Sequence, residues 1–496
     1  MAATSNLVLD DYEKTFRNVI DNELTSTAET RRAVDPSTGQ PLAEVPVSTQ
    51  ADVDRAVAAA QAAFVGWRER STDDRAGYLL QFADAIEANQ AGLGPLLGKE
   101  TGKPLQGQAI ELFHLGSLIR QMVPLRLEEE RKVVRRYLPL GVGVGIVAWN
   151  FPMGLAVVKL AAALLVGNTF ILKPSPYSPY TALKLGEIGA RIFPPGVFQV
   201  LSGGEDLGPM FTSHPGVAKI SFTGSVATGK KVMAACGAHL KRVTLELGGN
   251  DAAIICPDVD LATTVPKIAF LSYVNSGQIC LAVKRVYVHE SIYDAFLAAF
   301  VEAVKTFKVG PATDAEAALG PVQNSMQYGK LQALYGEVAQ QGLKVAYKAD
   351  LPPALDGKGG FYLPSTVVDN PPEDSRLVAE EQFGPIVPLL KWSDEEDVIR
   401  RANATLMGLG GSVWSADTAR AERMTRQLEA GTVWVNSHFE ITPNVAFGGF
   451  KESGVGVEQG LDGLKGGAIT NFSLRSNNAA NIMRLSQEDV GVCSEP

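Results

Sequence analysis

The segment from Gly141 to Leu172 constrains the fold more than any other stretch of this chain. It is apolar almost throughout, and Asn150, Pro152 and Lys159 interrupt it. A lysine near the centre of a bilayer is costly, so a membrane span is disfavoured. Pro152 and the glycines instead divide the segment into a strand, a helix and a second strand, expected at 142–148, 153–165 and 169–172. Apolar strands joined by a helix are typical of a buried parallel sheet.

The same alternation of strands and helices continues along the chain. Further strands are expected at 197–201, 217–222 and 243–247, and a second set at 252–255, 286–289, 366–368, 386–390 and 432–435. Before residue 141 the pattern is helical, and Thr49 with Asp52 forms a capping-box signature ahead of the helix expected at 53–64. A chain of 496 residues is too long for one core. We therefore expect two α/β units that meet near residue 248.

Composition excludes several classes of function. The formal net charge of −9 argues against a nucleic-acid partner, which requires a basic face. The four cysteines contain no Cys-x-x-Cys pair and the five histidines lie singly, so neither a disulfide scaffold nor a metal site is expected. The sequence begins without a charged segment followed by an apolar one, which predicts a cytoplasmic protein with no membrane partner.

Two glycine-rich stretches resemble nucleotide-binding motifs. The first, from Gly141 to Gly145, lies inside an expected strand and is the weaker candidate. The second, from Thr223 to Lys231, follows a strand and opens a helix, so its backbone N–H groups would face a phosphate. Lys231 stands where a P-loop needs Ser or Thr to hold Mg²⁺, which disfavours an NTPase. A dinucleotide phosphate site is predicted, and a plain tight turn is the alternative.

Three further residues are candidates for chemistry. Glu246 ends an apolar strand, where burial would raise its pKa toward that of a general base; a structural ion pair is the alternative. Cys280 lies in a loop after Gly277 and could be a nucleophile, whereas the other cysteines are expected to be small buried apolar residues (Cys236, Cys256 and Cys493). Asn150 either caps the following helix or offers its amide to an oxyanion.

Together these stretches resemble the aldehyde dehydrogenase superfamily over roughly residues 30–475. Seven motifs in the family's order carry the resemblance: Trp149-Asn150-Phe151-Pro152, Lys173-Pro174-Ser175, Phe222-Thr223-Gly224-Ser225 with Gly229, Glu246-Leu247-Gly248-Gly249, Asn275 to Cys280, Glu381 to Pro385, and Phe447 to Gly454. The resemblance implies an α/β fold in three parts. These are a Rossmann-like parallel-sheet cofactor domain (1–122 and 140–247), an α/β catalytic domain (248–452), and a small β-arm for oligomerisation with the C-terminal segment (123–139 and 453–496).

The resemblance implies a role for each candidate. Cys280 would attack the aldehyde carbon, and the Asn150 amide and the Cys280 backbone N–H would hold the oxyanion. Glu246 would activate the water that hydrolyses the thioester, and Glu458 would assist proton relay. The reaction would oxidise an aldehyde to the carboxylic acid with hydride transfer to NAD(P)⁺. A CoA-acylating enzyme and a catalytically silent structural homologue are the alternatives. The presence of Glu246 disfavours the first, and the presence of Cys280, Glu246 and Asn150 together disfavours the second.

The resemblance also implies a cofactor, a substrate class and an assembly. Pro176 stands where many NAD-selective members carry a Glu that repels a 2′-phosphate, so NAD is expected and NADP is possible. The other cofactor-binding residues would be Trp149, Lys173, Ser175, Gly224, Ser225, Gly229, Leu247, Glu381 and Phe383. Apolar neighbours of the catalytic residues predict an aliphatic or aromatic aldehyde (Phe151, Met153, Ile279 and Leu281). A charged hairpin around 126–137 and the segment 467–475 resemble oligomerisation arms, which predicts a homodimer or homotetramer.

Overall fold

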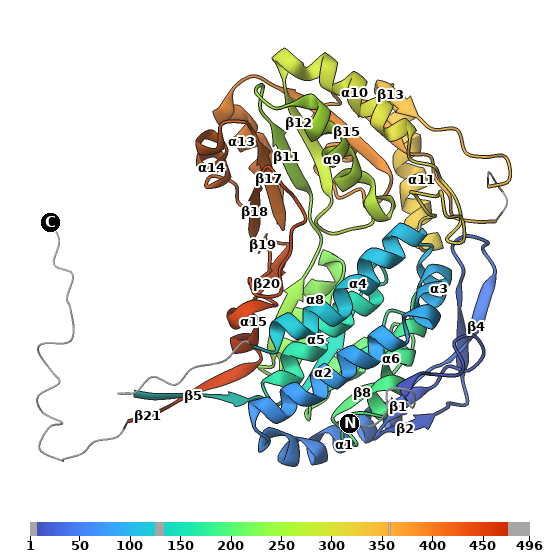
Figure 1. Ribbon diagram of the computed structural model, residues 1–496, viewed down its shortest axis with the longest axis vertical. Helices are drawn as coiled ribbons and strands as arrows, with labels where there is room; N and C mark the ends of the chain where they lie inside the picture. Colours follow the sequence, from blue (N-terminus) through green and yellow to red (C-terminus); the bar gives the residue numbers. More distant parts are fainter. Residues whose placement is uncertain (1–6, 125–132, 356, 358, 475–496) are drawn as a thin grey trace, which may run out of the picture.

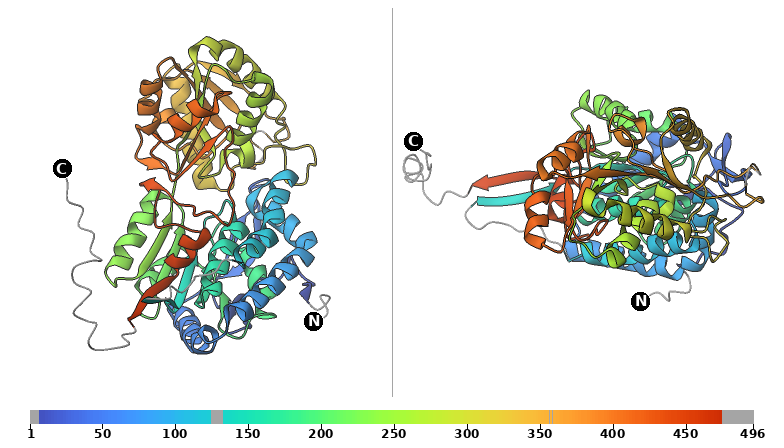
Figure 2. Two further views of the ribbon diagram at one scale, coloured as in Figure 1. Left: turned by 60° about the vertical axis from the view of Figure 1, so that its left-hand side comes forward. Right: turned by 90° about the horizontal axis from the view of Figure 1, so that it is seen from above.

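The computed structural model of this chain describes residues 7–124, 133–355, 357 and 359–474. Two α/β lobes lie one above the other in Figure 1, and a two-stranded ribbon projects from the lower lobe. Figure 2 shows the same ribbon extending from the body in a view from above. Each lobe is built on one large sheet whose central strands are parallel, so the predicted α/β fold class is confirmed.

The sheet of the lower lobe has the strand order β2-β1-β8-β7-β6-β9-β10-β20. Its strands are β1 (Asn18–Ile20), β2 (Glu23–Thr25), β6 (Val142–Ile146), β7 (Thr169–Lys173), β8 (Phe198–Val200), β9 (Lys219–Thr223), β10 (Arg242–Glu246) and β20 (Gly454–Val455). The strands from β8 to β10 in this order pair in parallel, whereas β1, β2 and β20 are antiparallel at the edges. The parallel direction brings the carboxyl ends of β6, β7, β9 and β10 to one edge of the sheet.

Helices cover this sheet on both faces, as its fully apolar strands require. They are α1 (Gln50–Arg68), α2 (Thr72–Ala88), α3 (Gln90–Thr101), α4 (Leu105–Met122), α5 (Pro152–Leu165), α6 (Tyr180–Ala190), α7 (Leu207–Ser213), α8 (Val226–Gly237) and α15 (Gly460–Gly466). The predicted capping box is present, because Thr49 accepts from the Asp52 N–H and the Asp52 carboxylate accepts from the Thr49 N–H. In the described part of the chain, no helix is both long enough and apolar enough to cross a membrane.

The sheet of the upper lobe has the order β13-β14-β15-β12-β11-β17-β18. Its strands are β11 (Asp251–Ile255), β12 (Val283–His289), β13 (Val345–Lys348), β14 (Thr366–Asp369), β15 (Ile386–Trp392), β17 (Gly410–Trp414) and β18 (Thr432–Val435). Around it lie α9 (Leu261–Tyr273), α10 (Tyr293–Lys305), α11 (Ser325–Gln340), α12 (Arg376–Ala379), α13 (Glu395–Asn403) and α14 (Thr418–Thr425), with short 3₁₀ turns at Val274–Gly277 and Glu290–Ile292. The sequence did not predict β17, because its two glycines are not typical of a strand, although the strand is buried between β11 and β18.

Three small two-stranded sheets complete the fold: β3 (Thr30–Val34) with β4 (Pro41–Pro46), β16 (Met407–Gly408) with β19 (Phe450–Lys451), and β5 (Val133–Pro139) with β21 (Ala468–Leu474). The last pair is the projecting ribbon, in which seven residues of each strand are in antiparallel register. The predicted charged hairpin lies only partly within the described residues, since 125–132 fall outside them, as do residues 475–496. The division of the chain into three domains stays a prediction.

Candidate active site and cofactor site

A cavity of about 1040 Å³ lies where the carboxyl edge of the lower sheet meets the upper lobe. Its wall comes from segments far apart in the sequence, including the end of β10, the start of α5 and the loop before β12. Ten of the predicted site residues line it: Trp149, Asn150, Gly224, Ser225, Glu246, Leu247, Cys280, Glu381, Phe383 and Glu458. All four predicted catalytic residues therefore face one space.

The loop that presents Cys280 begins with an unusual backbone turn. Asn275, Ser276 and Gly277 are consecutive residues in the left-handed region, with φ of 53°, 56° and 72°. A Cβ on Gly277 would lie 2.3 Å from the Gly384 carbonyl oxygen, so only glycine fits there. A hydrogen bond from the Ser276 hydroxyl to the Gly320 carbonyl, over 2.8 Å, holds the turn in place. Such strained turns concentrate at functional sites, and this one directs the cysteine into the cavity.

The Cys280 thiol and the Glu246 carboxylate are in direct contact. The Sγ atom donates to Glu246 Oε1 over 3.0 Å, and the Thr223 hydroxyl donates to Oε2 over 2.9 Å. Burial raises the pKa of Glu246, while the positive charge of Lys159 opposes that rise. Burial also raises the pKa of the Cys280 thiol well above its usual value, and the charge of Glu246 adds to the effect. A protonated nucleophile thus lies against a carboxylate with raised proton affinity.

The alternative of an ion-paired Glu246 is not what the structure shows, since its hydrogen-bond donors are a thiol and a hydroxyl. The helix-cap alternative for Asn150 is also wrong. The N-cap of α5 is Phe151, and the N–H groups of Met153 and Gly154 donate instead to the Glu111 carboxylate from α4. The Asn150 amide donates to the Gln278 carbonyl over 3.0 Å, which ties it to the cysteine loop, and Asn150 lines the cavity.

Glu458 reaches the cavity from the C-terminal part of the chain. Its carboxylate pairs with Lys159 Nζ at 2.5 Å and accepts a hydrogen bond from the Ser221 hydroxyl. The sequence marked Lys159 only as an interruption of an apolar segment. A buried lysine in an apolar helix needs a partner of opposite charge. This requirement is the sequence feature that could have predicted the ion pair of Lys159.

The predicted adenosine end of the cofactor site lies at the end of β7. Lys173 is buried, and burial together with the nearby Arg31 lowers its pKa to about 8. Its ammonium group donates to the Pro174 carbonyl over 3.1 Å. Arg31, which the sequence did not suggest, extends from β3 and donates to the Pro176 carbonyl over 2.7 Å. Ser175 and Pro176 follow Pro174 directly, so the side chains of Lys173 and Arg31 both lie beside this segment.

The predicted phosphate end lies at the start of α8. Ser225 is the N-cap of this helix of 12 residues and accepts from the Thr228 N–H. The first turn of a helix has N–H groups without partners inside the helix, and such groups bind anions. A Cβ on Gly229 would lie 2.5 Å from Leu247 Cδ2, which shows how closely Leu247 packs over the first turn. Gly224 and Ser225 line the cavity beside it. The donors at this end suit a phosphate.

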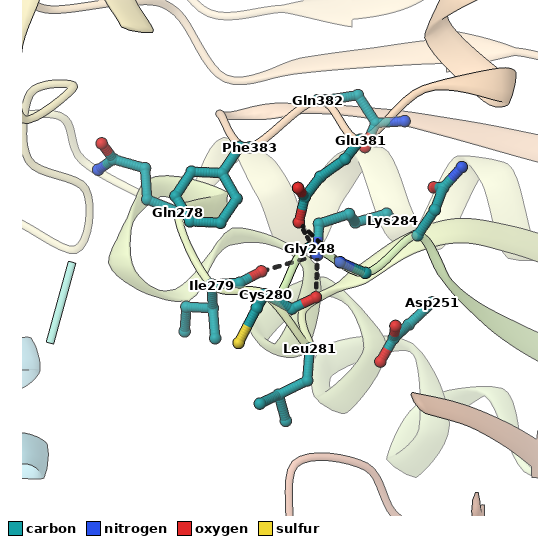
Figure 3. A network of polar contacts seen from close by, with 12 residues as sticks. Gly248, Asp251, Gln278, Ile279, Cys280, Leu281, Lys284, Glu381, Gln382 and Phe383 are labelled. Atoms are coloured by element: carbon teal, nitrogen blue, oxygen red, sulfur yellow. Dashed lines mark hydrogen bonds and ion pairs between the residues drawn. The ribbon is translucent and has the colours of Figure 1, made fainter. Parts of the chain in front are cut away.

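The predicted nicotinamide end is formed by Trp149, Glu381 and Phe383. The two aromatic rings meet edge to face with centroids 5.3 Å apart. Glu381 Oε1 accepts from the Gly249 N–H over 3.1 Å and lies 3.4 Å from Lys284 Nζ (Figure 3). Buried lysine, helix N-terminus, carboxylate and aromatic rings are the groups that bind a ribose, a pyrophosphate and a nicotinamide, so the residues present fit a dinucleotide.

Many of the remaining lining residues of the cavity are apolar. Phe151, Ile279 and Leu281 line it as predicted, but Met153 does not, because its side chain points from the first turn of α5 into the core and is fully buried there. Further apolar lining residues are Leu118, Leu155, Val158, Phe270, Phe439 and Ile441. Cys236 and Cys256 are buried, as predicted, and Cys493 lies outside the described residues. Within the described ranges, no three His, Cys, Asp or Glu side chains gather as a metal site.

Comparisons with known proteins identify the family of this chain. A model of the aldehyde dehydrogenase family matches residues 24–469. The aldehyde dehydrogenase LUC3 of Fusarium sp is 40% identical over 456 residues, which cover 91% of this chain and 96% of that protein.

Two solved structures have closely similar folds. The indole-3-acetaldehyde dehydrogenase AldA of Pseudomonas syringae, a mutant in complex with NAD⁺ and IAA, has a TM-score of 0.89 at 30% identity and covers 92% of this chain and 96% of its own. Aldehyde dehydrogenase C from the same organism, a mutant in complex with NAD⁺ and octanal, has a TM-score of 0.89 at 30% identity, with 94% and 98% covered. The chain belongs to the aldehyde dehydrogenase family and is an aldehyde oxidoreductase that uses NAD.

Proposed function

We propose that this protein oxidises an apolar aliphatic or aromatic aldehyde to the carboxylic acid through a covalent intermediate on Cys280. The observation that carries the proposal is the 3.0 Å contact between the Cys280 thiol and Glu246. A thiol with a raised pKa is a poor nucleophile until a base takes its proton, and Glu246 is placed to do so.

In the proposed mechanism, the proton passes from Sγ to Glu246 as sulfur bonds to the aldehyde carbon. The resulting thiohemiacetal oxygen is negatively charged and needs preorganised donors. The second amide N–H of Asn150 and the backbone N–H of Cys280 supply them, because the first amide N–H already holds Asn150 against the loop at Gln278. When bound, NAD⁺ supplies the acceptor for the hydride that leaves this carbon.

Glu246 has a second role in the proposal. Glu246 first gives up the proton that it took from the thiol. Water then attacks the thioester left on Cys280 and passes a proton to Glu246, and the tetrahedral intermediate collapses to the carboxylic acid with the Cys280 thiolate as leaving group, which regains a proton. Glu458, which lines the same cavity and pairs with Lys159, offers the proton a route away. We assign cofactor binding to Trp149, Lys173, Ser175, Pro176, Gly224, Ser225, Gly229, Leu247, Glu381 and Phe383.

The apolar lining of the cavity supports the substrate class. Phe151, Ile279 and Leu281 surround the space next to the nucleophile. The similar structures carry IAA and octanal, which are an aromatic acid and a linear aliphatic aldehyde. The presence of Glu246 in contact with the thiol favours hydrolysis over transfer to CoA, and the assembled site argues against a silent homologue.

The test is a panel of aliphatic and aromatic aldehydes with NAD⁺, followed by NADH absorbance and product analysis with and without CoA. We expect the carboxylic acid at equal rates in both conditions. Cys280→Ser is expected to lower turnover by several orders of magnitude, with wild-type thermal stability as the control. Formation of acyl-CoA alone would favour the alternative reaction, and full activity of Cys280→Ser would refute the mechanism.

We also propose that the β5–β21 ribbon is an assembly arm and that the protein is a cytoplasmic homodimer or homotetramer. The ribbon projects from its own lobe in Figure 2, and Leu138 and Ile469 on it are exposed apolar residues. A partner strand or surface would cover them. Light scattering at micromolar concentration tests this, and a monomeric mass would contradict it.

A further inference from the structure

The backbone carbonyl groups around the nucleophile are held by buried side chains. Lys284 Nζ donates to the Ile279 carbonyl over 2.7 Å and to the Cys280 carbonyl over 2.6 Å (Figure 3). The next carbonyl, that of Leu281, lies 2.9 Å from Nε2 of the buried His438. The carbonyls of three consecutive residues, the cysteine and its two neighbours, are thus held by two side chains, and neither of these side chains lines the cavity.

Lys284 also contacts the cofactor side of the site. Its ammonium group lies 3.4 Å from Glu381 Oε1, which also accepts from the Gly249 N–H. Gly249 allows this close packing, since a Cβ there would lie 2.4 Å from the Cys280 carbonyl oxygen. All three N–H donors of the lysine therefore have acceptors: two carbonyls of the nucleophile loop and one carboxylate assigned to the cofactor.

Because the peptide bond is planar, the contact of Lys284 with the Ile279 carbonyl also sets the direction of the Cys280 N–H. The Ile279 carbonyl and the Cys280 N–H belong to one trans peptide unit and point in opposite directions. When Lys284 holds the oxygen, it also directs the N–H that the oxyanion needs. Burial and the charge of Glu246 raise the pKa of the Cys280 thiol, and the positive charge of Lys284 opposes that rise.

We propose that Lys284 is a positioning residue for the nucleophile, which aims the Cys280 N–H at the oxyanion and places a buried positive charge behind the thiol. The proposal rests on the function proposed above. A lysine in this position also joins the nucleophile loop to Glu381, so that the cysteine and the ribose-binding carboxylate keep one relative placement.

The test compares Lys284→Met with the wild type by two measurements. The first is the rate of Cys280 alkylation by iodoacetamide between pH 6 and 10, without aldehyde or cofactor. Loss of the cation is expected to slow alkylation about ten-fold at pH 8 and to move its pH profile upward. The second is steady-state oxidation, where kcat is expected to fall roughly 100-fold with KM for the aldehyde within a few-fold, because the lost alignment acts on the transition state.

Lys184→Met is the matched control. Lys184 is equally buried and donates to one backbone carbonyl, that of Thr15, over 2.7 Å and to the Glu187 carboxylate over 3.0 Å, but it lies in α6 away from the cavity. It is expected to lose thermal stability while keeping the wild-type alkylation profile. If Lys284→Met does not fold, Lys284→Gln keeps an amide donor without the charge and is expected to show the same upward shift.

A folded Lys284→Met or Lys284→Gln variant that is alkylated at the wild-type rate with the wild-type pH profile would overturn the proposal. Alkylation requires no dehydrogenase activity, so this outcome is separate from failure of the proposed function. A wild-type protein that oxidises no aldehyde would refute that function, while the alkylation profiles would still decide the role of Lys284.

Discussion

The Sγ atom of Cys280 lies 3.0 Å from Oε1 of Glu246, although 34 residues separate them in the chain. One residue ends a strand of the lower lobe and the other precedes a strand of the upper lobe. The nucleophile and its base are therefore contributed by different lobes, and their distance depends on how the lobes pack. Their contact leads to the first prediction.

Glu246→Gln is expected to lower kcat about 10²-fold to 10⁴-fold, because an amide cannot accept the proton of the thiol or of the water. It should also slow alkylation of Cys280 at neutral pH, since the thiol loses its base. Rapid-mixing measurement of NADH separates the two roles. A full first turnover followed by a slow steady state would show that Glu246 acts only in hydrolysis.

Thr223→Val tests the hydrogen bond to the other carboxylate oxygen of Glu246. The Thr223 hydroxyl donates to the charged carboxylate and so lowers its pKa against the rise caused by burial. Without it the pKa of Glu246 rises further, and activity requires the unprotonated form. The acid limb of kcat/KM should move to higher pH by about one unit, and an unmoved limb would show that another group sets it.

The pair of Lys103 with Glu111 is almost fully buried, and Glu111 belongs to the cavity wall. The Glu111 carboxylate also accepts from two N–H groups at the start of α5, so it fixes the helix that follows Asn150. Glu111→Leu is expected to cost about 3–5 kcal/mol of unfolding free energy, because it leaves a buried ammonium without its carboxylate. The double variant Glu111→Leu with Lys103→Met should lose less unfolding free energy than Glu111→Leu alone. Denaturant unfolding checks both, and equal losses would mean that the charge is not the cause.

Glu100 makes stability depend on pH. Burial raises its pKa to about 7, while hydrogen bonds from Thr181 and Tyr180 oppose the rise. A carboxyl group with a raised pKa in the folded state contributes stability that is full below its unfolded pKa and is lost as pH rises through about 7. Relative to the wild type, Glu100→Gln should therefore become steadily more stable from pH 5 to pH 8. A constant difference in melting temperature over that range would contradict this.

Arg31 bears on cofactor choice. It donates to the Pro176 carbonyl, at the position where a repelling carboxylate is missing, and lies close enough to Lys173 to affect its pKa. A guanidinium group binds phosphate well, so we expect NADP to be accepted beside NAD. Arg31→Ala should raise KM for NADP about ten-fold and change KM for NAD little. Parallel effects on both cofactors would indicate a purely structural role.

The sequence by itself determined the local features. Apolar periodicity predicted the strands β6, β7, β9 and β10 and the helices between them, because these patterns extend over neighbouring residues. The glycine turn before Cys280 and the helix start at Ser225 were also readable, since each depends on the conformational preferences of a few adjacent residues.

The tertiary structure alone decided which side chains meet. Nothing in the sequence near Lys284 indicates that it bonds the carbonyls of Ile279 and Cys280, although these lie only five and four residues away, because the contact depends on how the loop folds back against β12. Nothing near Arg31 indicates Pro176, because that contact joins segments 145 residues apart. Strand β17 was missed for a related reason: its burial between two neighbours, and not its own glycine-rich sequence, makes it a strand. Local residue types indicate the chemistry of this protein, but the distance between the Cys280 thiol and Glu246 is set only by the packing of the two lobes.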